Sequence, residues 1–542
     1  MKKEKTVNFI CYLLLSVLCV YVIYLFTYFT QHSTFLFGDD GYSSLYPYIE
    51  EGMFDCLKFK LHGDGYMGLF LTKFFSFGLP VKLGIHPADF IGIPHGIIKG
   101  IFASLTFLSV SNFVNLFRKS AFLYLLSFIL LIFLFFDTAV SVTTTVIMCS
   151  YNFYRYFFSL FFMGIFLNFV LKSILFKEDK TDIKKLIFAS LSGFIAATSV
   201  EINIFSLLMF VLLIFLYSVI VNKFTKNKKI SDSFEIKLNK NFYIPSVFVI
   251  LAVSAVTLSK TGFQNMAAAR GLGSAVITPD LIISFVNQFI DIYFLHNSVL
   301  IILFIVLLAV SLFFAVKNRE IKTIIIPLFF VFSVLTSLSS LILLEKTNGG
   351  DFWLNHPNII FLFRMLLVFP LLYFISYIYK NLKFLHNSIA ETVIFSLIIC
   401  FSLKAFTDMQ FQNIVPQVDI NLKRKAYIAE KMLRFYYLQN RRPVLPEDIM
   451  HSVDFGSWED ANTEDYNTEN KINSSYYPRI YKNNISAQFG YEYDNDAIKK
   501  FYGAGGIFSR EELENIQFSR LFNEDFVLNK DYTTKELYDL IQ

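Results

Sequence analysis

Eleven long apolar runs divide the first three quarters of the chain, and polar or charged segments separate them. Each run holds roughly twenty residues, which is the length that an α-helix needs to cross the hydrocarbon core of a bilayer. The pattern therefore predicts an all-α, polytopic membrane protein with about eleven transmembrane helices. These are expected near residues 10–29, 97–117, 120–136, 154–174, 185–200, 203–222, 242–259, 297–316, 323–344, 358–379 and 387–406.

The charges of the short loops predict how these helices are oriented. Alternate loops are rich in lysine and arginine, beginning with the N-terminal head and continuing with Arg118-Lys119. Because basic loops stay on the cytoplasmic side of a membrane, the N-terminus is predicted to be cytoplasmic. The first loop, residues 31–96, the later loop 260–296 and the chain after the last helix are then expected on the outer side.

Two of the outer segments hold further predicted helices. Residues 68–77 of the first loop place four leucine and phenylalanine side chains at helical spacing, which indicates a surface helix. In loop 260–296, the triplet Thr278-Pro-Asp precedes an apolar run and is typical of a helix start. We expect this second helix to lie on the membrane surface or to re-enter it.

The end of the chain is predicted to form a small, mainly helical outer domain, residues 407–542. It begins with an amphipathic pattern over 422–436 and holds two capping boxes, at 509–512 and 533–536. The chain is therefore interpreted as a transmembrane domain, residues 1–406, followed by this outer domain.

Composition and charge agree with this division. Hydrophobic residues make up 55% of the chain and charged residues 17%, whereas soluble domains hold about 25% charged residues. Residues 408–542 contain 16 basic and 22 acidic side chains, while the rest of the chain is basic. A basic membrane part and an acidic tail suit two compartments better than they suit binding to nucleic acid.

The sequence gives little support to metal or cofactor chemistry. The five cysteines show neither metal-ligand spacing nor a disulfide framework. His62, His86 and His95 lie in or beside the first loop, but without the tight spacing of a zinc site. Walker, dinucleotide-binding, HExxH and GxSxG motifs are absent from the sequence. We therefore expect no metal centre and no organic cofactor, although paired carboxylates could hold a divalent cation beside a phosphate.

Acidic residues gather in the first outer loop, close to the membrane. Asp39-Asp40 follows the first predicted helix by about ten residues, and Asp64 lies further along the loop. Ionisable groups at a bilayer indicate function. Two adjacent carboxylates can supply a general base, hold a divalent cation against a phosphate, or cap a helix that starts near Tyr42.

One helix, a large outer loop with an acidic pair near the membrane, further helices and an outer C-terminal domain together resemble the GT-C superfamily of integral-membrane glycosyltransferases. Asp39 and Asp40 occupy the place of the acidic pair. The block His62-Gly-Asp64-Gly-Tyr66 looks like the bacterial glucosyltransferases that modify O-antigen and related polysaccharides. Many relatives in that branch carry an arginine just after the glycine that here precedes Tyr66. The resemblance covers roughly the first 175 residues and the overall plan.

The resemblance implies an inverting glycosyltransferase in the inner (plasma) membrane of a bacterium. Its donor would be a sugar on polyprenyl phosphate, and its acceptor a cell-surface glycan or a lipid-linked molecule at the outer face. Either Asp39 or Asp40 would act as the general base that deprotonates the acceptor hydroxyl. His62 and Asp64 would bind substrate.

A lipid phosphate needs a cationic partner, and few basic residues are expected on the outer side. The candidates are Arg155, Arg270 and Arg364, and Trp353 is a candidate for stacking on a sugar ring. Each arginine could instead form a structural ion pair with an outer-side carboxylate, and Arg155 could extend its charge to the interface. Trp353 could belong to the aromatic belt of the membrane surface.

Three other functions remain open at this point, one of which is that of an interaction or assembly protein. A flippase or transporter for a lipid-linked saccharide is disfavoured because the sequence shows no internal repeat and places its acidic residues in a loop rather than in the helices. A polysaccharide polymerase also has about a dozen helices and large outer loops, but its working loops tend to be rich in arginine.

Overall fold

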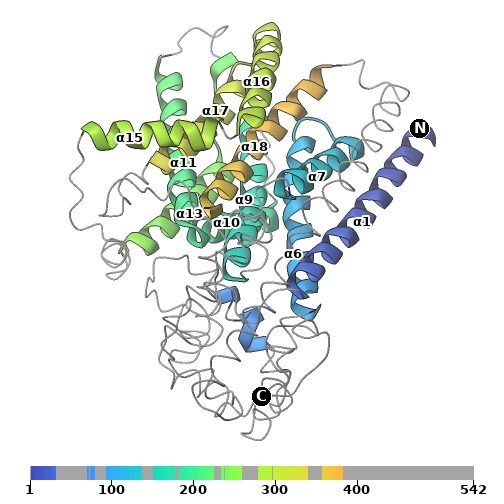
Figure 1. The fold of residues 1–542 in the computed structure, drawn as a ribbon. Helices are drawn as coiled ribbons and strands as arrows, with labels where there is room; N and C mark the ends of the chain where they lie inside the picture. The colour runs from blue at the N-terminus through green and yellow to red at the C-terminus, as the bar shows by residue number, and fades with distance from the viewer. Residues whose placement is uncertain are drawn as a thin grey trace, which may run out of the picture.

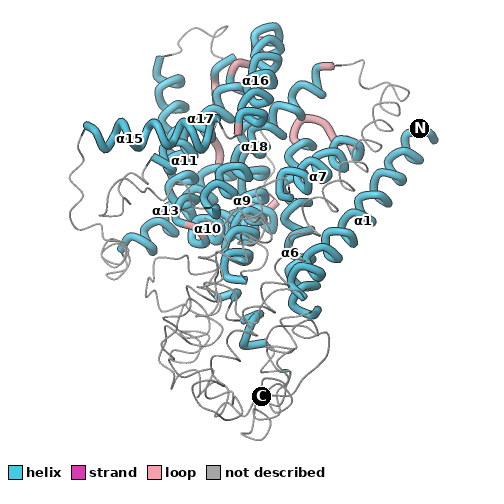
Figure 2. Tube along the Cα trace, viewed as in Figure 1, coloured by secondary structure: helices cyan, strands magenta, loops and turns pink. Residues whose placement is uncertain are grey.

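The computed structural model describes residues 2–31, 70–72, 74–79, 83, 93–136, 150–176, 182–224, 233–236, 238–258, 279–295, 297–339 and 357–382. Within these ranges nearly every residue is helical and none is in a strand (Figures 1 and 2). The elements are α1 (Lys2–Gln31), η3 (Phe74–Gly78), α6 (Ile93–Ser111), η4 (Asn112–Asn115), α7 (Ala121–Phe136), α9 (Ser150–Phe176), α10 (Ile183–Ser199), α11 (Glu201–Phe224), α13 (Lys240–Leu258), α15 (Pro279–Phe289), η6 (Ile290–Leu295), α16 (Ser298–Asn318), α17 (Lys322–Ser339) and α18 (Pro357–Asn381).

Helices occupy ten of the eleven predicted apolar runs. Seven helices in the described ranges are long and apolar enough to cross a membrane. Lipid favours this outcome because an isolated segment can satisfy its backbone groups there only as a helix. The run 387–406 and the predicted outer domain 407–542 lie outside the described residues. The all-α class with several apolar helices is therefore confirmed, whereas eleven crossings and an outer domain stay predictions.

Helices α1 and α6 pack closely because α6 carries two glycines four residues apart. A methyl group added at Gly96 would lie 2.6 Å from the Cα atom of Thr27, and one at Gly100 would lie 2.5 Å from the Cα atom of Ile23. These contacts leave no room for a side chain, so the two backbones touch directly. The pairing is antiparallel, and the end of α1 lies beside the start of α6 (Figure 1).

Small and hydroxylated residues let α10 fit between α9 and α13. A methyl group at Gly193 would lie 2.6 Å from the ring of Phe166 on α9 and 3.2 Å from Val249 on α13. Asn203 of α11 donates to Ser159 of α9 (2.5 Å), which in turn donates to the carbonyl of α10 at residue 196 (3.1 Å). These side-chain hydrogen bonds hold three helices together where a hydrophobic driving force between helices is absent.

Helix α18 is the most deeply buried of the long apolar helices. It packs against α16, α17, α7 and α9, and against η4 through Phe113 and Phe369, whose ring centroids are 4.9 Å apart. Ser376 donates to the carbonyl of Val114 (2.6 Å). Two prolines lie inside helices here, Pro370 in α18 and Pro327 in α17.

Helix α15 begins at Pro279, immediately after Thr278, so the predicted helix start is confirmed. It lies across the direction of α16 (Figure 1) and continues into the π-helical turn η6. Tyr293 of η6 is buried against Phe363 of α18, with ring centroids 4.8 Å apart. Helix α15 also exposes apolar side chains, such as that of Ile283. Such exposure is what its predicted position at the membrane surface requires. In the first loop, helical structure is described over 70–72 and in η3, inside and just beyond the predicted surface helix.

Candidate functional site

Only two of the predicted site residues fall within the described part of the chain. Arg155 lies in the second turn of α9, and Arg364 lies about two turns into α18. The other six lie outside the described residues, so their predicted roles stay predictions; they are Asp39, Asp40, His62, Asp64, Arg270 and Trp353.

The first loop leaves the bundle and returns to it at one place, because α1 ends at Gln31 beside the start of α6 at Ile93. We call this end of the bundle the loop end. The π-helical turn η3 also lies here, since Phe75 stacks on Tyr154 of α9 at 5.3 Å between ring centroids. The first turns of α6 and α9 thus lie together at the loop end, beside η3 and the end of α1.

Three basic side chains are buried at the loop end. His95 and Lys99, one turn apart on α6, are both 0% exposed, and Arg155 on α9 is 8% exposed. Residues four apart share one face of a helix, so His95 and Lys99 both face α9, where Nε2 of His95 meets Tyr154 and the ammonium of Lys99 meets Phe153. Burying positive charge at this level costs several kcal/mol unless negative charge compensates it. Negative charge, from the protein itself or from a ligand, must therefore balance the cations of this site.

Tyr154 ties α6 to α9 at this site. A hydrogen bond of 2.8 Å joins its hydroxyl to Nε2 of His95, and the two rings stack at 5.7 Å between centroids. Tyr154 is itself fully buried. Arg155 is the next residue and lies about 100° further around α9. One turn of α9 therefore supplies both the tyrosine that contacts His95 and, on a different side, the arginine.

Aromatic rings surround the basic side chains. The ammonium of Lys99 lies 5.7 Å from the ring centroid of Phe153, and the guanidinium of Arg155 lies 5.5 Å from that of Tyr156. Such rings attract cations through their negative faces. They also hold water away, which strengthens every charge interaction inside the site.

The structure bears on the alternatives for Arg155. Its side chain is buried beside Tyr156, and it does not extend its charge to solvent as a surface-reaching arginine would. The ring of Tyr156 in turn lies 6.1 Å from that of Phe361 on α18. Tyr156 therefore joins this turn of α9 to the start of α18, and Arg155 lies beside Tyr156 at the loop end.

Arg364 is half-buried and has a defined neighbour. Its Nε donates to Oδ1 of Asn297 (2.5 Å), and Nδ2 of Asn297 donates to the carbonyl of Ile292 in η6 (2.9 Å). The sequence pointed to a carboxylate or a phosphate as the partner, whereas the structure adds a buried amide. Arg364 therefore links α18 to the junction of α15, η6 and α16. This contact positions the helices, and it is compatible with a ligand contact of the same side chain.

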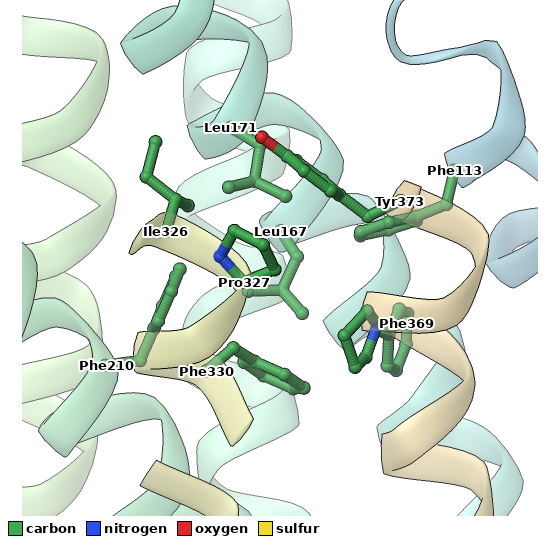
Figure 3. Close-up of a pocket in the computed structure, with 10 residues that line it drawn as sticks. Phe113, Leu167, Leu171, Phe210, Ile326, Pro327, Phe330, Phe369 and Tyr373 are labelled. Atoms are coloured by element: carbon green, nitrogen blue, oxygen red, sulfur yellow. The ribbon is translucent and has the colours of Figure 1, made fainter. Parts of the chain in front are cut away.

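A separate apolar cavity of about 20 Å³ lies among α9, α11, α17, α18 and η4 (Figure 3). Pro327, Phe330 and Phe369 line it, and the hydroxyl of Tyr373 points along its edge toward Leu171. A second small cavity adjoins it between α17 and α18. These spaces are too small for a sugar, so we regard them as the packing consequence of two prolines that interrupt facing helices.

Sequence reasoning missed Lys99 and Tyr154. Lys99 is the single charged residue of the predicted run 97–117, and its spacing from His95 was a readable signal. The contact between His95 and Tyr154 joins residues 59 positions apart, which no local pattern reveals.

In the described residues, no three histidine, cysteine, aspartate or glutamate side chains lie close enough to hold a metal ion. The predicted carboxylates of the first loop lie outside this search, so the expectation of a protein without a metal centre stays untested. Comparisons with family models, with curated proteins and with solved structures find no match to this chain. Its function is therefore argued from its residues.

Proposed function

We propose that the chain transfers a sugar from a polyprenyl-phosphate donor to a cell-surface glycan or lipid-linked acceptor at the outer face of a bacterial plasma membrane. The observation that carries the proposal is the burial of Lys99, with His95 and Arg155, where the acidic first loop leaves the bundle. The proposal treats this end as the outer one, as the basic residues of the opposite loops predict.

The position of the basic side chains favours a lipid-borne anion. Lys99 lies in the second turn of α6, and α6 together with η4 is long and apolar enough to cross a membrane. An anion that reaches this depth must enter along the membrane surface with a hydrocarbon carrier or through a polar loop. A phosphate ester of a long isoprenoid has both the charge and the carrier.

The length of the connection allows the acidic pair to reach that phosphate. Asp39 and Asp40 follow Gln31 by eight and nine residues, which limits them to within about 30 Å of it at full extension. In the proposed reaction one of the two carboxylates removes the proton of the acceptor hydroxyl. The acceptor oxygen then attacks the anomeric carbon from the face opposite the phosphate, so the configuration inverts.

The bond between the anomeric carbon and the phosphate oxygen breaks in the same step, and its electron pair leaves with polyprenyl phosphate. Lys99 and Arg155 are proposed to stabilise the negative charge that grows on this leaving group, in a site from which aromatic rings exclude water. His95, held by Tyr154, is proposed to donate a further hydrogen bond to the phosphate. A divalent cation held by the acidic pair is compatible with this chemistry and is not required by it.

The test compares surface glycans in a strain that lacks the gene and is complemented with variants. Asp39→Asn/Asp40→Asn and Lys99→Gln are each expected to lose one sugar branch that the wild-type chain restores. Lys184→Gln, at an exposed position near the start of α10, is the matched control and should restore the branch. Membrane levels of every variant are measured by immunoblot.

Two outcomes would count against the proposal. An unchanged glycan with the double aspartate variant would remove the general-base role. A truncated glycan with an accumulated lipid-linked intermediate would point to a polymerase or a flippase instead.

A further inference from the structure

The end of the bundle opposite the loop end carries exposed rather than buried positive charge. Three connections meet there: residues 116–120 between η4 and α7, residues 317–322 between α16 and α17, and residues 379–382 at the end of α18. Figure 2 places the first and the last of them at the upper end of the view. Together they hold six basic side chains and one acidic one, and we call these six the basic rim: Arg118, Lys119, Lys317, Arg319, Lys322 and Lys380.

Specific contacts hold the rim in one shape. Lys380 pairs with Glu320 at 3.2 Å, and the hydroxyl of Tyr377 donates to the same carboxylate at 3.0 Å. The guanidinium of Arg118 lies 5.7 Å from the ring centroid of Tyr379, so the first connection is anchored on α18. The amide of Asn318 donates to Oδ1 of the asparagine at position 381 (2.7 Å), which joins the second connection to the third.

The turn between α16 and α17 presents its arginine outward. Arg319 adopts a left-handed backbone conformation with φ of 55°, and its N–H bonds back to the carbonyl of Val316 (3.2 Å), as a helix-ending residue does. Its side chain is exposed, as are those of Lys317 and Arg118. Glu320 is the one acidic residue of the three connections, and it pairs with Lys380, so the rim keeps an excess of positive charge.

The surface beside the rim is apolar. Phe313 and Val316, in the last turns of α16, are 63% and 59% exposed, and α16 is the least buried of the long apolar helices. A ligand that contacts both the basic rim and this apolar surface must therefore carry a negatively charged group next to a hydrocarbon part. Nucleic acids and acidic proteins lack that arrangement, whereas a phospholipid has it by construction.

We propose that the basic rim binds the headgroup phosphates of anionic phospholipids, with the acyl chains lying along the exposed side of α16. Arg118 and Arg319 are assigned the main contacts, because a guanidinium can give a phosphate two parallel hydrogen bonds. The proposal does not depend on the glycosyl-transfer reaction, and neither residue belongs to the loop-end site.

The test uses the purified full chain in detergent, titrated with phosphatidylglycerol or phosphatidylcholine and followed by native mass spectrometry and thermal unfolding. The wild-type chain is expected to retain phosphatidylglycerol and to unfold at a higher temperature with it. Arg118→Gln/Arg319→Gln should bind it about thirty-fold more weakly, because each basic group near a membrane surface contributes a factor of about five and the two factors multiply. Inorganic phosphate at the same concentration should bind neither form.

The matched control is Lys184→Gln/Lys185→Gln on α10, which removes two exposed charges outside the rim. It should retain wild-type affinity for phosphatidylglycerol. The proposal is overturned if the control loses affinity as much as the arginine variant does, if the arginine variant binds like the wild type, or if phosphatidylcholine serves equally well. Folding of the arginine variant is checked by its unfolding midpoint without added lipid, which should stay within a few degrees of the wild-type value.

Discussion

The close packing of α1 on α6 predicts that replacing Gly100 by alanine lowers the free energy of unfolding. Helix propensity alone predicts that the same change raises it. An alanine at Gly100 would place its methyl carbon 2.5 Å from the Cα atom of Ile23 and 3.0 Å from its carbonyl oxygen. Carbon atoms normally approach to about 3.6 Å, so the two helices would have to move about 1 Å apart. Both clashing atoms belong to backbone, so no side-chain rotation relieves the contact.

The expected cost follows from the same contact. In a helix without neighbours, Gly→Ala stabilises by about 0.5–1 kcal/mol because alanine loses less conformational freedom. Forcing a methyl group into a closely packed interface costs about 1–3 kcal/mol. Gly100→Ala should therefore lower the free energy of unfolding by about 1–2 kcal/mol, where propensity alone predicts a gain.

The assay is thermal unfolding in detergent, read with a thiol-reactive dye. Cys11 of α1 is 1% exposed, so its labelling, measured in a chain whose other four cysteines are replaced by serine, reports the loosening of α1. Gly100→Ala should lower the midpoint and speed the labelling of Cys11. Gly193→Ala is the matched control, because its methyl group would meet the ring of Phe166, a side chain that can turn. A midpoint for Gly100→Ala at or above the wild-type value would refute the close backbone contact.

Two further substitutions test single contacts. Asn297→Ala removes the hydrogen bonds to Arg364 and to the carbonyl of Ile292. In chemical unfolding it should destabilise the chain by about 1–3 kcal/mol. A loss below about 0.5 kcal/mol, as at an exposed site, would show that this amide does not hold η6. Glu320→Gln weakens a contact that is about one-third exposed, so it should cost less than about 1 kcal/mol and should cost less still at 0.5 M salt, where the wild-type pair is screened. A loss that persists unchanged at high salt would mean that hydrogen bonding, rather than charge, holds the lysine.

The helices could be predicted from the sequence because lipid leaves an apolar run few alternatives. The run 120–136 and helix α7 agree to within one residue at the start, and the triplet at Thr278 correctly marked the start of α15. In both cases the signal is local: apolar length in one, and a proline with a preceding threonine in the other. Local signals suffice when the environment permits only helices.

The site could not be predicted to the same degree, because its contacts join distant parts of the chain. Arg155 was correctly placed near the start of its helix, but the ring beside it, that of Tyr156, packs on Phe361 of α18, which is about 200 residues further along. Lys99 was not among the predicted site residues, because its burial arises only from the packing of α1 and α9 around α6. Asn297 became the neighbour of Arg364 through a π-helical turn, for which the sequence has no recognised signature.

The pairing of α1 with α6 also has a consequence for biosynthesis. Helix α6 ends about eighty residues after α1 does, and at about 5–20 residues per second its last residue is made roughly 4–16 s later. During that interval the glycine-lined face that α1 will occupy does not yet exist. Until then α1 lacks the neighbour against which it packs in the folded chain. The contact between these two helices is therefore expected to form only after the whole connection between them has been made, and before α18 exists to pack on η4.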